Sequence, residues 1–367
     1  MVSMTTAVRG SAVFCVSACV AAVALGRMTT AEPTLRSWDG TKLVCLTLLD
    51  KARGDQRLSF VDLKTGTEQS LRLSPGERLD QPAAAPWHEE SGQTQIVGFW
   101  SRRSGTGANG LTRETGLARF RFPEGTALDR VALDVTPYGA PCWYPGTKAQ
   151  VLFADGGGTL WRFAFEGSLE PDVTSDGRDA RPSPIVWKTA PPGVDERSVR
   201  MYEPSWPEGR AFDGKLIVSL SHQVRDQNGH RYTAPKLWWL SLDAEGRAIE
   251  AAGPLTRDDE DSETKERCAR VFKAPSGKFQ VAYLVKHLEQ SSWELAVAPL
   301  AFDGDGQPFS PPGLAVPLAN QAAMVAPAFS EDGRWLYYLA LPHEEGNARR
   351  VAIPPLGDGV HGLRAAH

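Results

Sequence analysis

The sequence has few of the residues and patterns that usually reveal a catalytic or metal site. Its 367 residues include 5 cysteines and 7 histidines, and the histidines are scattered along the chain. The chain contains no His-Glu-x-x-His, no clustered Cys/His set and no Gly-x-Ser-x-Gly. Those patterns would indicate a metalloprotease, a zinc site or a serine hydrolase. We therefore expect no metal and no cofactor, and no catalytic residue can be chosen from the sequence.

An excess of one charge is also lacking. The formal net charge is −4 and the isoelectric point is near 6.0. A nucleic-acid-binding protein would be expected to carry a basic stripe, so we expect no nucleic-acid partner. After residue 31 there is no helix-period segment of useful length and no polar linker rich in Pro and Ser. Residues 32–367 are therefore expected to form one all-β domain.

The chain has no apolar run of transmembrane length. Its longest, Ser11 to Leu25, has about fifteen residues, whereas a membrane span needs roughly twenty. Arg9 precedes this run, and Thr29-Thr30-Ala31 precedes a plausible cut before Glu32. Residues 1–31 are therefore read as a signal peptide, so the protein is expected to be periplasmic or extracellular.

Two alternatives to simple cleavage stay open. Val16-Ser17-Ala18-Cys19 resembles a lipobox, so Cys19 could carry a lipid, and translation could instead start at Met28 and leave a cytoplasmic protein. Contact with a membrane is expected only through the N-terminal segment. Three cysteines follow it, Cys45, Cys142 and Cys268, and their odd number and wide spacing argue against a disulfide framework. We interpret them as small buried hydrophobic residues.

What the sequence does have is a repeat, seen best in APAFSEDGRWLYYLAL from Ala326 to Leu341. Phe329 precedes Asp332-Gly333, and an apolar run follows at once. Asp-Gly between two extended segments predicts a two-residue hairpin turn, because Gly accepts a positive φ. The following run is apolar throughout, which predicts a strand covered on both faces.

Six copies of this unit can be aligned. Each has an aromatic residue, then a Gly turn, then an apolar run: Trp38 with Gly40, Trp87 with Gly92, Trp143 with Gly146, Trp206 with Gly214, Phe272 with Gly277, and Phe329 with Asp332 and Gly333. A third apolar run follows in every copy and a weaker fourth in several. Four strands repeated six times predict a six-bladed β-propeller with four antiparallel strands, a to d, in each blade.

The insertions suggest where binding occurs. The long ones fall in the d-to-a connections, Ser175 to Met201 and 257–267, or in the b-to-c connections, 101–115 and 221–236. In a propeller both kinds of connection lie on one face, and loops on a rigid scaffold often carry function. The segment 101–115, Gly-rich and basic, is expected to be an exposed loop. The residues that we expect on the binding face are Arg102, Arg103, Arg113, His222, Arg225, His230, Arg231 and His287.

The repeat resembles the TolB-type propeller repeat, which is similar in kind to WD40-like repeats and has the pattern Pro-x-Trp-Ser-Pro-Asp-Gly before an apolar strand. This resemblance covers nearly all of residues 32–367. It implies an exported, six-bladed propeller that serves protein interaction. We therefore expect a non-catalytic monomer that binds a protein or a cell-envelope polymer. The alternative is a propeller hydrolase or lyase acting on a carbohydrate or peptide in the central funnel, where three or more acids or histidines would converge.

Overall fold

The computed structural model describes most of the chain from residue 34 to residue 356. The described residues are 34–38, 42–50, 55–62, 68–73, 77–88, 94–107, 110–122, 126–144, 150–165, 181–192, 194–207, 212, 214–225, 231–256, 264–322, 324, 327–330, 332–340 and 348–356. The predicted signal segment, 1–31, lies outside them. The described regular structure consists of strands, and among the described residues there is no helix long and apolar enough to cross a bilayer.

The described strands form six sheets, antiparallel except for one parallel pair in sheet 4, and one small hairpin; we number the sheets in chain order. Sheet 1 contains β1 (Thr34–Trp38), β2 (Lys42–Asp50), β3 (Asp55–Asp62) and β4 (Glu68–Arg72). Sheet 2 contains β5 (Glu77–His88), β6 (Thr94–Gly107), β7 (Gly110–Phe122) and β8 (Thr126–Ala132). Sheet 3 contains β9 (Pro137–Trp143), β10 (Gln150–Asp155), β11 (Leu160–Ala164) and β12 (Ser183–Pro184).

The second half of the chain continues the pattern. Sheet 4 contains β14 (Arg200–Ser205), β15 (Lys215–Arg225), β16 (Arg231–Leu242), β17 (Ala248–Pro254) and, at its edge, β13 (Val186–Trp187). Sheet 5 contains β18 (Thr264–Lys273), β19 (Phe279–His287), β20 (Trp293–Pro299) and β23 (Val316–Ala322). Sheet 6 contains β24 (Ala328–Phe329), β25 (Trp335–Leu339) and β26 (Ala348–Ala352), and the hairpin pairs β21 (Ala301–Phe302) with β22 (Pro308–Phe309).

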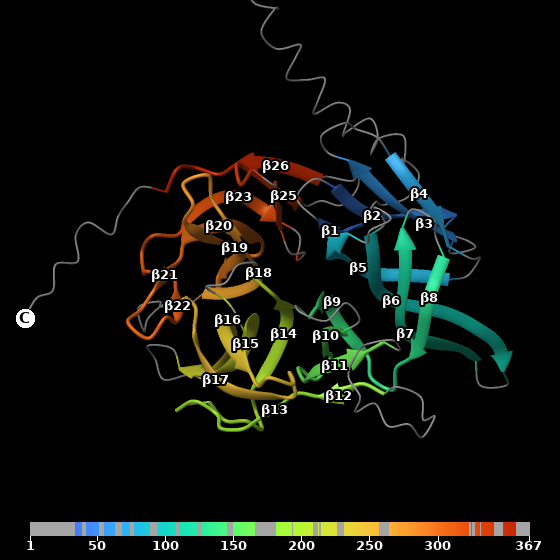
Figure 1. The fold of residues 1–367 in the computed structure, drawn as a ribbon, viewed down its shortest axis with the longest axis horizontal. Helices are drawn as coiled ribbons and strands as arrows, with labels where there is room; N and C mark the ends of the chain where they lie inside the picture. The colour runs from blue at the N-terminus through green and yellow to red at the C-terminus, as the bar shows by residue number, and fades with distance from the viewer. Residues whose placement is uncertain are drawn as a thin grey trace, which may run out of the picture.

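The sheets are arranged radially, as in a β-propeller (Figure 1). The first strands of sheets 1 to 5 contact one another in chain order around the centre, and β1 also contacts β24 in sheet 6. The first and last sheets therefore meet, although each sheet consists of consecutive parts of the chain. The propeller fold predicted from the repeat is confirmed.

The predicted six blades of four antiparallel strands are not confirmed. Five sheets have at least four strands, and sheet 6 has three. From the sequence, the outer strand of the last repeat could come from the segment that begins at Gly359 or from the segment around Glu32 to Leu35. The first lies outside the described residues, and Thr34 and Leu35 pair instead with β2 of sheet 1. Sheet 4 departs from the prediction in the opposite direction, because β13 adds a fifth strand and pairs with β17 in parallel.

The aromatic residues of the six repeat units occupy equivalent places. Each lies in the first strand of its sheet or, for Trp206, directly after it: Trp38, Trp87, Trp143, Trp206, Phe272 and Phe329. The Trp143 indole N–H donates a hydrogen bond of 3.1 Å to the Ala83 carbonyl in the preceding sheet. The repeat glycines Gly40, Gly92 and Gly146 lie outside the described residues. The other three adopt positive φ: Gly214 (73°), Gly277 (82°) and Gly333 (65°).

The turn at Asp332-Gly333 is longer than the two-residue turn predicted from Asp-Gly. The Gly333 N–H donates to the Ser330 carbonyl at 2.8 Å, and the Ser330 N–H donates to the Trp335 carbonyl at 2.9 Å. Gly333 has a positive φ and Asp332 does not, so Asp332-Gly333 is not the centre of a type I′ turn. The Ser330 hydroxyl accepts the Trp335 N–H at 3.0 Å and closes the loop.

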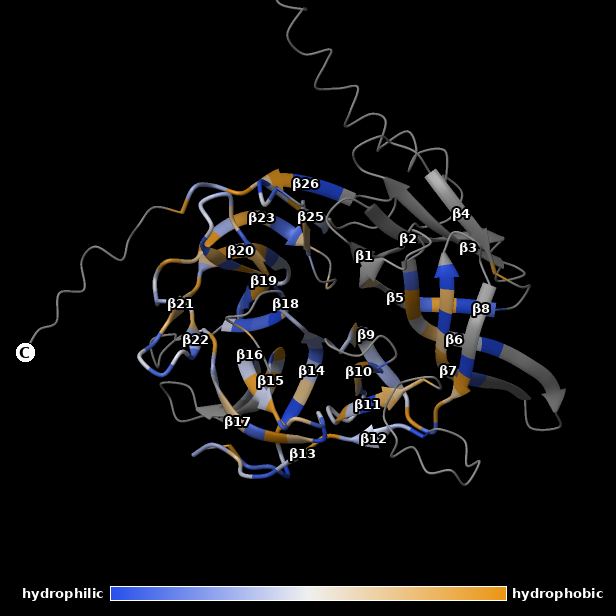
Figure 2. Cartoon of the chain, in the orientation of Figure 1, coloured by the Kyte–Doolittle hydropathy of each residue, from blue (hydrophilic) through white to orange (hydrophobic). Residues whose placement is uncertain are grey.

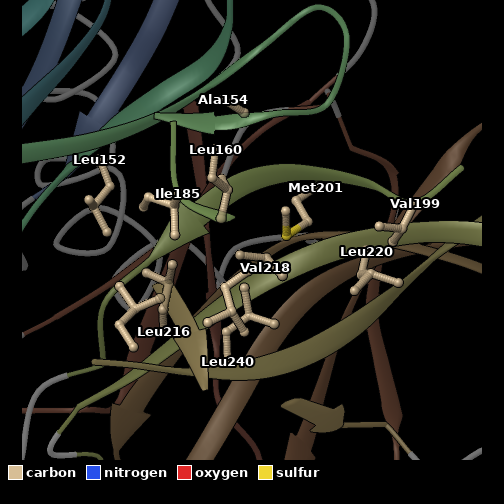
Figure 3. Packing of buried hydrophobic residues seen from close by; sticks show 12 residues of the cluster. Leu152, Ala154, Leu160, Ile185, Val199, Met201, Leu216, Val218, Leu220 and Leu240 are labelled. Carbon is tan, nitrogen blue, oxygen red and sulfur yellow. The ribbon is translucent and has the colours of Figure 1, made fainter. Parts of the chain in front are cut away.

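Where their side chains are described, the middle strands are buried on both faces, as their unbroken apolar sequences predicted. In β10, Val151 and Phe153 pack in the cluster between sheets 2 and 3. The alternating residues Leu152 and Ala154 pack instead in the cluster between sheets 3 and 4, which Figure 3 shows. Each fully buried Val, Leu or Phe side chain contributes about 1.5–3 kcal/mol to folding. Sheets 2 to 6 therefore stabilise their neighbours in series.

Candidate functional site

Two of the insertions chosen from the sequence prove to be extensions of hairpins. The pairing of β6 with β7 continues from Thr94↔Phe122 to Gly107↔Gly110. That of β15 with β16 continues to Arg225↔Arg231. The expectation of a loop over 101–115 was therefore wrong for most of its length, because polar residues with β propensity continue the ladder there. Both extensions are b-to-c connections and belong to one end of their sheets.

The predicted face residues can now be placed along these hairpins. Arg102 is exposed and pairs with Glu114, whereas Arg103 pairs with Arg113. In sheet 4, His222 pairs with Ala234 and Arg225 pairs with Arg231. His287 is exposed at the end of β19, opposite Thr264. His230 lies outside the described residues. The described members thus occupy the b-to-c ends of sheets 2, 4 and 5.

The expectation that all long insertions share this face was wrong in two places. The connection from Ser175 to Met201 contains the edge strands β12 and β13, so part of it runs along the outer rim of the ring (Figure 1). The hairpin β21–β22 lies between β20 and β23, which makes it a c-to-d insertion on the opposite face. Of the segment 257–267, the last four residues begin β18.

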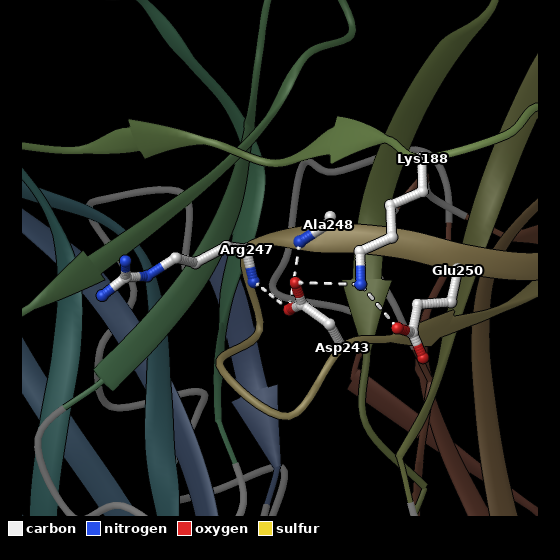
Figure 4. Close-up of polar contacts among 5 residues, drawn as sticks. All are labelled: Lys188, Asp243, Arg247, Ala248 and Glu250. Atoms are coloured by element: carbon white, nitrogen blue, oxygen red, sulfur yellow. Dashed lines mark hydrogen bonds and ion pairs between the residues drawn. The ribbon is translucent and has the colours of Figure 1, made fainter.

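The rim segment joins two neighbouring sheets. β12 pairs with β11 of sheet 3, Ile185 is buried between sheets 3 and 4, and β13 pairs with β17 of sheet 4. The Lys188 ammonium then lies 2.6 Å from a Glu250 carboxylate oxygen and 3.8 Å from one of Asp243 (Figure 4). The Glu250 carboxylate raises the pKa of Lys188 through this hydrogen bond. We call residues 183–188 the clasp, because they join sheets 3 and 4 at the rim, and we interpret their role as structural.

A second site, which the sequence did not suggest, lies where the first strands meet. All five first strands of sheets 1 to 5 contain a register shift of the kind that a β-bulge produces. Glu203 and Cys268 sit in two of these bulges with φ of 54° and 57°. Positive φ is uncommon for residues other than glycine and marks backbone strain. Bulges often re-aim side chains next to active sites.

The residues before three of these bulges come together: Tyr138, Tyr202 and Arg267, from sheets 3, 4 and 5. The tyrosine ring centroids are 5.1 Å apart. The Arg267 guanidinium carbon lies 5.2 Å from the Tyr138 centroid and 5.3 Å from that of Tyr202. Arg267 also donates a hydrogen bond of 3.0 Å to the Tyr138 hydroxyl. We call these three residues, together with Glu203, the axial cluster.

Glu203 is the anionic partner in the axial cluster. Its Oε1 lies 2.6 Å from Arg267 Nη2. Its Oε2 accepts hydrogen bonds from the Ser219 hydroxyl at 3.0 Å, the Cys268 N–H at 2.9 Å and Arg267 Nε at 3.3 Å. The side chains of Arg267 and Glu203 are 12% and 11% exposed. Three sheets are therefore linked by one largely buried, charge-assisted network.

This environment changes the acidity of the groups inside it. Burial by itself would lower the pKa of Arg267, but the Glu203 carboxylate beside it keeps that pKa above its ordinary value. Burial raises the pKa of the Cys268 thiol, and the Glu203 charge raises it further. Burial also raises the pKa of Cys142 to about 11, against an opposing effect of Arg270. Both cysteines are free thiols; Cys268 is buried, as predicted, whereas Cys142 is half-buried.

The axial cluster escaped the sequence analysis because its members come from three repeats. A signal was present, since Tyr138, Tyr202 and Arg267 stand four or five positions before Trp143, Trp206 and Phe272. The catalytic alternative expects three or more acids or histidines to converge, and the axial cluster contains one acid. Among the described residues no group of three or more His, Cys, Asp or Glu could hold a metal. The scattered histidines are not brought together there.

Comparisons with known proteins return structural similarity alone. No family model matches the chain, and no curated protein matches it. The Cps50 (Swd1) β-propeller domain of Myceliophteria thermophila is 9% identical, with a TM-score of 0.46, over 88% of this chain and 98% of that one. The α-L-arabinanase of Cellvibrio cellulosa is 13% identical, with a TM-score of 0.38, over 77% and 95%. A thermostable family-43 glycoside hydrolase is 11% identical, with a TM-score of 0.39, over 76% and 92%.

Proposed function

We propose that this protein is an exported, non-catalytic β-propeller that binds a protein or cell-envelope polymer through the b-to-c hairpins of sheets 2 and 4. The observation that supports this most strongly is that both hairpins are extended at the b-to-c end of their sheets. Each extends past the neighbouring strands at the same end of its sheet, and the intervening sheet 3 has a compact b-to-c turn at Gly156-Gly157-Gly158. The two long hairpins therefore offer a partner more surface at this end of the ring than the short turn of sheet 3 does.

The charge of the hairpins suggests the chemistry of the contact. Residues 101–115 carry three arginines against one glutamate, a net +2 in a chain of net −4. Residues 221–236 carry two arginines and one lysine against one aspartate, again a net +2. Arg103↔Arg113 and Arg225↔Arg231 place like charges at directly opposite positions, an arrangement that costs stability in a sheet. An anionic partner would offset this cost, so the partner surface is proposed to be acidic.

Three finer features belong to the same proposal. Residues 1–31 are an export signal, with lipidation at Cys19 as the alternative, and N-terminal sequencing of the mature protein tests both. Sheet 6 is the sixth blade of a TolB-like propeller. Its contact with β1 and the apolar cluster that it shares with sheet 5 support this assignment. The protein acts as a monomer, which sedimentation equilibrium tests.

Shortening the hairpins tests the proposed face. Ser101 and Ser221 are buried, and Lys236 donates a hydrogen bond of 2.6 Å to Thr264, so these residues should stay. The variants therefore replace 103–113, or 224–232, by a two-residue Asn-Gly turn. Binding to immobilised poly-L-glutamate and polyphosphate is measured by surface plasmon resonance at rising salt concentration, with neutral dextran as the blank.

We expect the native protein to bind one of the two polyanions, with an affinity that falls as salt screens the contact. Each shortened variant should lose most of the binding and keep its thermal unfolding nearly unchanged. The matched control is Arg334→Glu, which reverses a charge that is 71% exposed in the a-to-b turn of the opposite face. The proposal is wrong if the native protein binds neither polyanion, or if Arg334→Glu weakens binding as much as the shortened hairpins do.

A further inference from the structure

The axial cluster holds more hydrogen-bond donors than its own acceptors use. Arg267 has five N–H donors, and three contacts to Glu203 and Tyr138 engage its three nitrogens. The Nη2 contact is an ion pair that lacks hydrogen-bond geometry. Among the described residues, no acceptor pairs with the Tyr202 hydroxyl. Such a surplus of donors suits a ligand that brings acceptor atoms.

Arg270 adds a positive charge to this region. It follows Arg267 across the bulge in β18, and both guanidinium groups belong to half-buried residues. Its one hydrogen bond in the described part of the chain is a contact of 3.5 Å to the Ala269 carbonyl, and no carboxylate there forms an ion pair with it. Its charge acts on Cys142 in sheet 3 as well as on Cys268 beside it. Arg270 therefore lies near the sheets that also build the axial cluster.

Arg267 and Arg270 carry two positive charges, and of the two arginines Arg267 alone is paired with a carboxylate among the described residues, that of Glu203. A half-buried, unpaired guanidinium is costly unless a partner compensates it. Figure 2 shows that β18 is largely hydrophilic, whereas β20 of the same sheet is largely hydrophobic. The hydrophilic residues of β18 lie on the innermost strand, where the sheets meet.

We propose that the axial cluster and Arg270 form a binding site for a small anion, a carboxylate or phosphate group carried on an uncharged ring. The anionic oxygens would accept hydrogen bonds from Arg270 and from the unused donors of Arg267. The uncharged ring would lie against Tyr202, whose hydroxyl is the further donor. Glu203 holds Arg267 in place through its own contacts and is a positioning residue here.

The experiment uses three soluble sugars that share a pyranose ring and differ in charge: glucuronate, glucose 6-phosphate and glucose. Binding to the full-length protein is measured by isothermal titration calorimetry at low ionic strength. At least one of the two charged sugars should bind, and which one binds separates a carboxylate ligand from a phosphate ligand. Glucose should bind at least about tenfold more weakly, because it lacks the charge-assisted hydrogen bonds.

Arg270→Gln should weaken binding of the charged sugar by about tenfold or more and leave the weak binding of glucose unchanged. Because Arg270 has no ion-pair partner among the described residues, this variant should unfold at nearly the native temperature. Arg349→Gln, an exposed arginine in β26, is the matched control and should bind like the native protein. The proposal is overturned if Arg270→Gln binds as the native protein does, if glucose binds as tightly as the charged sugars, or if no sugar binds.

This site is separate from the hairpin face, so the two proposals can fail independently. The variants with shortened hairpins should bind the charged sugar with native affinity. Conversely, Arg270→Gln should still bind the polyanion. Loss of sugar binding in the shortened variants would overturn the axial assignment and would leave the hairpin face as the single anionic site.

Discussion

Replacing Glu203 by Gln is the most informative single change, because it removes a charge from the axial cluster and keeps the shape of the side chain. Arg267 and Glu203 are 12% and 11% exposed, so solvent screens the remaining guanidinium charge only weakly. Removing one partner of a buried ion pair costs about 3–5 kcal/mol, because the other charge is left uncompensated. The Gln amide can still accept one of the hydrogen bonds, so we expect a loss of about 3 kcal/mol, at the low end of that range.

The assay is urea unfolding followed by tryptophan fluorescence, which 11 Trp residues make sensitive. The double variant Glu203→Gln with Arg267→Met should recover part of the loss, because no unpaired charge remains. Glu250→Gln is the control, since the Lys188–Glu250 pair is 52% and 48% exposed and is expected to contribute little to stability. A loss of less than about 1 kcal/mol for Glu203→Gln, or a double variant less stable than both singles, would refute the reasoning.

Three further predictions concern stability and reactivity. Gly333→Ala should lower the free energy of unfolding in urea by about 3 kcal/mol, because Gly333 has a positive φ and the new Cβ would lie 2.5 Å from a backbone oxygen of sheet 5. Gly214 also has a positive φ, but a Cβ there meets open space, so Gly214→Ala should cost about 1–2 kcal/mol. The Cys142 thiol, with its pKa near 11, should be about 0.1% thiolate at pH 8. Alkylation of this thiol, mapped by mass spectrometry, should therefore be slow until the pH nears 11. Fast alkylation of Cys142 at pH 8 would contradict this prediction. Because the folded pKa lies above the unfolded one, the stability from this thiol is present below about pH 9 and is lost between about pH 9 and 11. Ile185→Ala, 3% exposed in the rim clasp, should cost about 2–4 kcal/mol by thermal unfolding, whereas Val186→Ala, 55% exposed, should cost less than about 0.5; equal costs would show that the clasp is not packed as described.

Much of the fold could be predicted from the sequence because it depends on local patterns. The apolar runs that became β2, β6, β10, β15, β19 and β25 were identified as strands buried on both faces, and every one forms a middle strand. The aromatic residues before them, such as Trp143, lie in or beside the first strands as the repeat predicted. These features follow from side-chain periodicity and turn residues, which a single sequence shows directly.

Other parts of the fold depend on contacts that no local pattern reveals. The edge strands β12 and β13 have two residues each, too few for a propensity signal, and their pairing is set by where the chain passes the rim. The bulges that bring Tyr138, Tyr202 and Arg267 together come from backbone geometry rather than composition. Both the axial cluster and the clasp were therefore missed, although an alignment of the repeats would have placed Tyr138 and Arg267 in one column and Tyr202 in the next.

The central claim is that the innermost strands of the sheets meet around one axis and bring side chains of three sheets into contact there. An electron-density map from crystals of the full-length protein tests it most directly. We predict sheet 6 beside β1, bulges in β9, β14 and β18, and the Arg267 guanidinium between Glu203 and Tyr138. An open ring, or regular strands that turn Arg267 away from Tyr138, would contradict the account.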